Sequence, residues 1–125
     1  MFKIYPGLYS EQETDNIVKY HEKFKDSRMS IFRPQGTTGF ERPLVDEFNN
    51  QVNSIQNPHL MGLSGKFSRS IKEILYAEKL RKCMTDFSSS EKFIHYQSMF
   101  FDKSTGTSLH QDTWYLDTAP AGKLF

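Results

Sequence analysis

The feature that most constrains the fold of this chain is a change in sequence pattern at Ser88-Ser89-Ser90. Before this tract, apolar residues recur mostly three and four positions apart, the spacing of helices that bury one face. After it, Lys92–Phe101 (KFIHYQSMFF) is aromatic, lacks Gly and Pro, and is too rich in apolar groups for one helical stripe. That composition predicts a strand. We therefore expect one α+β domain over residues 1–125, mainly helical over 1–89 and with strands over 90–125.

The charge balance disfavours partners that are recognised through positive charge. The chain has 16 Lys plus Arg and 15 Asp plus Glu, whereas nucleic acids and anionic membranes attract clustered basic residues. No apolar run approaches the roughly 20 residues of a membrane span, and the first thirty residues lack the apolar run of a signal peptide. The single cysteine, Cys83, cannot form an intramolecular disulfide. We expect a soluble, cytoplasmic protein that binds neither nucleic acid nor membrane.

The first helix has the clearest boundary signal. Ser10 followed by Glu13 forms a capping box, which predicts a helix over about Glu11–Lys25. His21 lies at helical spacing with the apolar residues of this segment, so we interpret it as a partly buried residue of the helix face rather than a metal ligand.

The middle of the chain combines turn and helix signals. Residues 33–43 (RPQGTTGFERP) predict a long loop, and apolar residues at spacings of three and four predict an amphipathic helix over Leu44–Gln56. Asn57-Pro58 has the form of an N-cap followed by proline at the first helical position. From Ser68 the pattern predicts one or two further helices, with Cys83 on their apolar face as a packed thiol rather than a nucleophile.

The last part of the chain carries the one pattern that points to chemistry. After a turn over Asp102–Gly106 we expect a second strand over Thr107–Tyr115, and a third beginning at Lys123. His110 and Asp112 are two residues apart in the second strand, so their side chains face the same side. An imidazole and a carboxylate placed in this way are two thirds of the 2-His-1-carboxylate triad that binds iron(II). A polar pair at a strand end remains the alternative interpretation of the motif alone.

The sequence around this motif strengthens the metal-binding interpretation. Tyr96–Lys103, a glycine-containing turn and Leu109–Leu116 (LHQDTWYL) together resemble the phytanoyl-CoA dioxygenase family of iron(II)- and 2-oxoglutarate-dependent oxygenases. Pro120–Phe125 is similar to the family's lead into its next strand. The specific resemblance covers about the last 30 residues. It implies a double-stranded β-helix, a cupin-like jelly roll, with the H-x-D motif on an early strand.

The resemblance also implies roles for particular residues. His110 and Asp112 would be iron ligands, and the reaction would use 2-oxoglutarate as cosubstrate to hydroxylate a small organic substrate. Gln97 would contact cosubstrate or substrate, although satisfying a buried backbone group is an equally good interpretation of this residue. Trp114 shares the parity of His110 and Asp112 along the strand, so it lies either in the wall of the substrate pocket or in the core.

One departure from the family pattern limits this expectation. The family's second metal-binding histidine and the basic residue for 2-oxoglutarate lie well beyond the H-x-D motif, whereas 13 residues follow Asp112 here. We therefore expect the N-terminal part of a dioxygenase, with an incomplete β-helix and no activity as an isolated chain. A non-catalytic binding module derived from the family is the alternative. Unpaired strand edges favour association, so we also expect a homo-oligomer.

Overall fold

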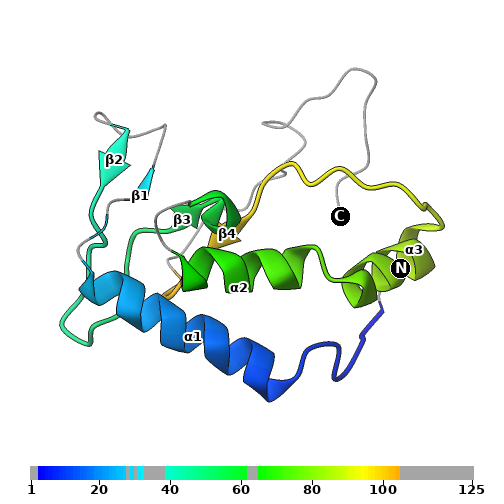
Figure 1. Ribbon diagram of the computed structural model, residues 1–125, viewed down its shortest axis with the longest axis horizontal. Helices are drawn as coiled ribbons and strands as arrows, with labels where there is room; N and C mark the ends of the chain where they lie inside the picture. The colour runs from blue at the N-terminus through cyan, green and yellow to red at the C-terminus, as the bar shows by residue number, and fades with distance from the viewer. Residues whose placement is uncertain (1–2, 28, 30, 33–38, 62–64, 105–125) are drawn as a thin grey trace.

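The computed structural model describes residues 3–27, 29, 31–32, 39–61 and 65–104. Helices α1 and α2 lie side by side, and α3 follows α2 after a short turn (Figure 1). Two small sheets lie beyond α2. The elements in chain order are α1 (Glu11–Asp26), β1 (Ile31–Phe32), β2 (Phe40–Glu41), β3 (Ile55–Gln56), the 3-10 helix η1 (Pro58–Leu60), α2 (Lys66–Leu75), α3 (Glu78–Ser88) and β4 (Met99–Phe100).

Both sheets in the described residues are antiparallel and two-stranded. β1 pairs with β2, and β3 pairs with β4 although Gln56 and Met99 are 43 positions apart in the sequence. In the second sheet Ile55 is opposite Phe100, and Gln56 is opposite Met99. The architecture therefore confirms the expected mixture of helices and antiparallel strands, although β1, β2 and β3 lie before α2 and α3, within the residues 1–89 expected to be mainly helical.

The capping box predicted for the first helix is present. The Ser10 hydroxyl accepts a hydrogen bond from the Glu13 backbone N–H at 3.3 Å, and the Glu13 carboxylate accepts one from the Ser10 N–H at 2.8 Å. Lys79 of α3 donates to the same carboxylate at 2.6 Å. These donors, with Lys79 the strongest, lower the pKa of Glu13 to about 2. The cap of α1 thus also fixes α3 against the start of the helix.

The core lies between α1, α2 and the β3–β4 sheet. Its fully buried apolar side chains are Phe24, Ile55, Phe67 and Ile71. The Phe24 and Phe67 rings stack with their centroids 5.6 Å apart, and Phe100 meets Phe67 edge-on at 5.2 Å. Phe100 therefore attaches the short β4 strand to the helical core.

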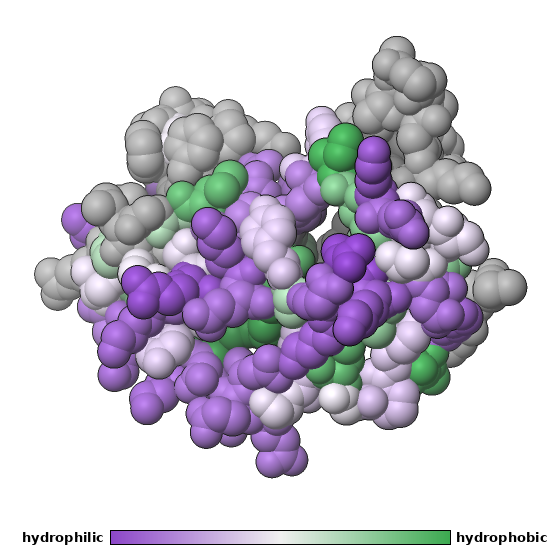
Figure 2. All heavy atoms as spheres, turned by 45° about the vertical axis from the view of Figure 1, so that its right-hand side comes forward, coloured by the Kyte–Doolittle hydropathy of each residue, from purple (hydrophilic) through white to green (hydrophobic). Residues whose placement is uncertain are grey.

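The face in Figure 2 is mostly hydrophilic, and its hydrophobic residues lie in separate patches. Within the described residues, every helix is too short or too polar to cross a bilayer.

The predicted helix over Leu44–Gln56 is wrong. The segment instead forms a tight turn closed by an isolated bridge between Val45 and Gln51. The Asp46 carboxylate accepts hydrogen bonds from the backbone N–H groups of Phe48 and Asn50 at 3.0 and 2.9 Å. Such local side-chain bonds compete with the helical ladder and favour turns.

Other boundaries also differ from the predicted ones. Of the predicted strand Lys92–Phe101, only Met99–Phe100 pairs with a neighbour. Pro58 does open η1, but Asn57 does not cap it; its backbone is left-handed and its side chain accepts the Ser98 N–H at 2.9 Å. Two helices, α2 and α3, occupy the region predicted to hold one or two, and Cys83 on α3 is half-buried. The predicted second and third strands lie outside the described residues.

Replacing Phe67 tests whether its ring organises the core. We expect Phe67→Ala to lower the free energy of unfolding by about 3–5 kcal/mol, because it removes a buried aromatic ring and leaves a cavity. Phe48→Ala is the matched control, since Phe48 is 74% exposed and its removal should change stability by less than about 0.5 kcal/mol. Urea denaturation followed by circular dichroism measures both. Equal losses in the two variants would contradict this assignment of the core.

Candidate functional site

The structure describes one of the site residues predicted from the sequence. Gln97 lies half-buried in the segment before β4, and its amide nitrogen is 3.3 Å from the Met99 sulfur. His110, Asp112 and Trp114 lie outside the described residues. The predicted grouping of Gln97 with the H-x-D motif therefore stays a prediction.

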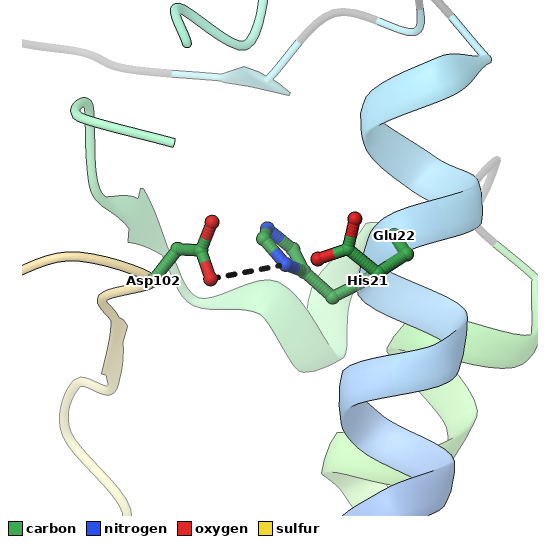
Figure 3. A group of neighbouring side chains, drawn as sticks. All are labelled: His21, Glu22 and Asp102. Atoms are coloured by element: carbon green, nitrogen blue, oxygen red, sulfur yellow. Dashed lines mark ion pairs between the residues drawn. The ribbon is translucent and has the colours of Figure 1, made fainter. Parts of the chain in front are cut away.

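A different group of potential metal ligands does come together. His21 and Glu22 of α1 meet Asp102, which follows β4 by two residues, and one ligand atom from each lies within 4.8 Å of the others. Figure 3 shows the His21 and Asp102 side chains pointing toward each other across the space between α1 and the chain after β4. Asp102 stands eight residues before His110.

His21 is the buried centre of this group. The side chain is 1% exposed and lies among the rings of Phe24, Phe67 and Phe100. Its Nε2 donates to the Gln51 side-chain oxygen at 3.0 Å, and the Gln51 amide nitrogen is held by the Asn53 carbonyl at 2.6 Å. Nδ1 lies 3.8 Å from an Asp102 carboxylate oxygen.

Burial decides the charge state of His21. Desolvation lowers its pKa and outweighs the opposing effects of the Gln51 hydrogen bond and the Asp102 charge. Near neutral pH the ring is therefore uncharged, with its proton on Nε2 and a lone pair on Nδ1. Such a nitrogen has the electronic form of a metal ligand.

The Asp102 side chain is an ionised carboxylate that accepts hydrogen bonds from strong donors. One of its oxygens accepts the Gln51 backbone N–H at 2.7 Å and the Lys25 ammonium at 3.1 Å. Partial burial raises the pKa of Asp102, but the Gln51 N–H and the Lys25 ammonium lower it by more, so the net direction is downward.

Lys25 supplies the positive charge that pairs with both carboxylates of this group. Its side chain is 3% exposed, and its ammonium lies 2.8 Å from Glu22, 3.1 Å from Asp102 and 2.7 Å from the Asn49 carbonyl. Burial lowers the pKa of Lys25, but the bonds and charges of Glu22 and Asp102 raise it, with a net rise. The ammonium thus already supplies a positive charge to both carboxylates. As arranged, the group is an ion-pair network that ties α1 to the 49–51 turn and to the chain after β4.

Sequence reasoning missed this network. It placed His21 on the apolar face of the first helix, where the structure finds it fully buried rather than partly so. The spacing of His21 and Lys25 puts them one helical turn apart on the same side, which is a local signal. No local pattern indicates their partner, because Asp102 is 77 residues from Lys25.

Comparisons with models of protein families, with curated proteins and with solved structures found no match to this chain.

Replacing Asp102 tests the network. We expect Asp102→Asn to lower the free energy of unfolding by about 1–3 kcal/mol, because the nearly buried Lys25 ammonium loses a charged acceptor. Asp86→Asn is a matched control, since Asp86 pairs with Lys3 at the surface and such pairs contribute about 1 kcal/mol or less. Thermal or urea unfolding at pH 7 compares the two. A larger loss for Asp86→Asn than for Asp102→Asn would contradict the proposed importance of the network.

Proposed function

We propose that this chain is the N-terminal part of an iron(II)- and 2-oxoglutarate-dependent dioxygenase that hydroxylates a small organic substrate. One observation carries the proposal: the His110-x-Asp112 motif within a segment that resembles phytanoyl-CoA dioxygenases. An imidazole and a carboxylate on one side of a strand suit iron(II) and leave positions open for other ligands.

The arrangement of the described residues supports this proposal indirectly. All three α-helices precede β4, which pairs with β3 and leads into the segment that carries the motif. Phe100 fixes β4 in the aromatic core, and Asp102 fixes the chain just beyond it through Lys25 and the Gln51 N–H. Binding sites need such support, because ligands must be held within a fraction of an ångström of their working geometry.

Each predicted site residue has a role in this proposal. His110 and Asp112 would hold the iron, which when bound would supply the binding of 2-oxoglutarate and the activation of oxygen. Gln97 and Trp114 would line the cosubstrate or substrate pocket that a double-stranded β-helix encloses. Residues 1–125 contain no counterpart of the family's second histidine and basic residue at their usual distance beyond the motif. We therefore propose that the isolated chain binds metal weakly and does not turn over.

Metal binding by motif variants tests the proposal. We expect the purified chain to bind iron(II), or manganese(II) as a redox-stable substitute, weakly, and to lose this binding in His110→Ala and Asp112→Ala. His95→Ala is the matched control, because His95 is an exposed histidine outside the motif and its removal should leave metal affinity unchanged. Isothermal titration under anaerobic conditions measures the affinities.

Three outcomes would contradict the proposal in different ways. Metal binding that survives both motif substitutions would remove the assignment of His110 and Asp112. Asp102→Asn separates the two acidic candidates, since binding lost in this variant and kept in Asp112→Ala would place the metal at the His21 network. Release of succinate from 2-oxoglutarate that depends on His110 would overturn the proposed inactivity of the isolated chain.

A non-catalytic interaction module is the second candidate, and the exposed apolar residues before the motif favour it. Ile94 is 94% exposed, and Tyr96 and Phe101 are also largely exposed. Apolar side chains on an extended segment favour association with another chain. We propose that this segment contributes to a homo-oligomer.

The oligomeric state tests this association. We expect light scattering to give a mass of at least a dimer, and Ile94→Lys to shift the protein toward monomer by placing a charge in the contact. Val18→Lys is the matched control, because Val18 is an exposed apolar residue of α1, away from the strand segment, and should leave the mass unchanged. A monomer at high concentration would refute the proposed association.

A further inference from the structure

A second group of titratable side chains lies outside the His21 network. His59 of η1 and His95 of the segment before β4 place their ring centroids 4.6 Å apart. Tyr76, at the end of α2, packs against both rings at 5.9 and 5.8 Å. Three separate parts of the chain thus meet through two imidazoles and a phenol.

Hydrogen bonds at this group join η1 to the residue before β4. The Asn57 N–H donates to the Ser98 carbonyl at 2.8 Å, and the Ser98 N–H donates to the Asn57 side-chain oxygen at 2.9 Å. His59 Nδ1 lies 3.2 Å from the Ser98 hydroxyl oxygen. We refer to these contacts of Asn57, His59 and Ser98 as the Asn57–Ser98 junction. Next to this junction, His95 Nδ1 lies 3.2 Å from the Tyr76 hydroxyl oxygen.

The electrostatic surroundings of His59 oppose a positive charge. The side chain is 7% exposed, and the charged or titratable groups that act on it are His95 from the segment before β4 and Lys72 from α2. Both are basic, and Tyr76 of α2 contributes a neutral phenol beside the pair. Burial first, and then His95 and Lys72, lower the pKa of His59. The junction is therefore formed with an uncharged His59 ring near neutral pH.

We propose that the His59–His95 pair makes the Asn57–Ser98 junction a pH-sensitive latch, which opens in mildly acidic solution and releases residues 91–98 from η1 while the α1–α2 core stays folded. Protonation of His59 places a positive charge in a buried position beside His95 and Lys72, both of which oppose it. Two unit charges at about 4 Å repel measurably even with the dielectric constant of water.

The direction of the effect follows from linkage. Because the pKa of His59 in the folded chain lies below its unfolded value of about 6.5, its contribution to stability is fully present above that value. The contribution is lost as the pH falls through the folded pKa. Acid therefore weakens the junction, and neutral pH restores it.

The release is local because little else holds this segment. Residues 91–98 make no strand ladder, and Ile94, His95 and Tyr96 within them are exposed. Segments with few buried contacts open at lower free energy than the core. The aromatic core contains His21, whose pKa burial also lowers, but the Gln51 hydrogen bond and the Asp102 charge oppose that shift, whereas His95 and Lys72 add to the shift at His59.

Amide hydrogen exchange in the full chain tests the latch. The amides of Asn57 and Ser98 report the junction, and that of Phe24 in α1 reports the core. Between pH 7.5 and pH 5.0, after correction for intrinsic rates, we expect the junction amides to lose about tenfold or more in protection; charge repulsion at this spacing accounts for most of that factor. Phe24 should retain its protection.

Two variants make the test specific. His95→Gln removes, at an exposed position, the neighbouring imidazole that opposes a charge on His59, and should reduce the acid-induced loss at Asn57 and Ser98. Lys92→Gln is the matched control, because it removes a permanent positive charge from an exposed residue of the same segment, and it should leave that loss unchanged. An equal loss of protection in His95→Gln and in the unsubstituted chain would overturn the latch. A loss of protection at Asn57 and Ser98 that occurs only together with a loss at Phe24 would also overturn it, because it would indicate global acid unfolding.

Discussion

Burial of the Phe67 ring is the interaction on which the other elements depend. Phe67 belongs to α2, yet its ring meets Phe24 and His21 of α1 and Phe100 of β4. Each contact joins elements that are far apart in the sequence. Because β3 pairs with β4, attachment of Phe100 to this ring also fixes the position of the sheet. The helical part and the strand part therefore share one aromatic centre rather than forming separate cores.

The ion-pair network follows from this centre. His21 must lie beside Phe67 and Phe100, and one turn later α1 brings the Lys25 side chain to nearly complete burial. A buried ammonium requires acceptors, and Glu22, Asp102 and the Asn49 carbonyl provide them. The requirement constrains Asp102 in particular, which also accepts the Gln51 N–H. Packing of α1 thus determines where the chain leaves β4 toward the H-x-D motif.

Local signals predicted the helices well, whereas features formed by distant residues were not predictable from pattern. The capping box at Ser10 and Glu13 identified α1 because both partners lie within one turn. The apolar residues of Leu44–Gln56 have helical spacing, but the Asp46 carboxylate accepts hydrogen bonds from backbone N–H groups in a turn. The spacing of apolar residues does not reveal that these bonds compete with a helix. The His21 network escaped prediction because Asp102 approaches α1 only after β4 has paired with β3. The roles of His110 and Asp112 still rest on resemblance.

The two side-chain anchors of β4 differ in how they respond to acid. The strand has two ladder residues, so contacts at Ser98 before it and Asp102 after it hold much of its position. The Asp102 carboxylate has a lowered pKa, so its contribution persists at neutral and mildly acidic pH and is lost only as the pH falls through that value. The His59 side of the Asn57–Ser98 junction weakens in the imidazole range, at higher pH. Acidification therefore loosens the chain before β4 while the chain after it, which leads to the motif, stays fixed to α1.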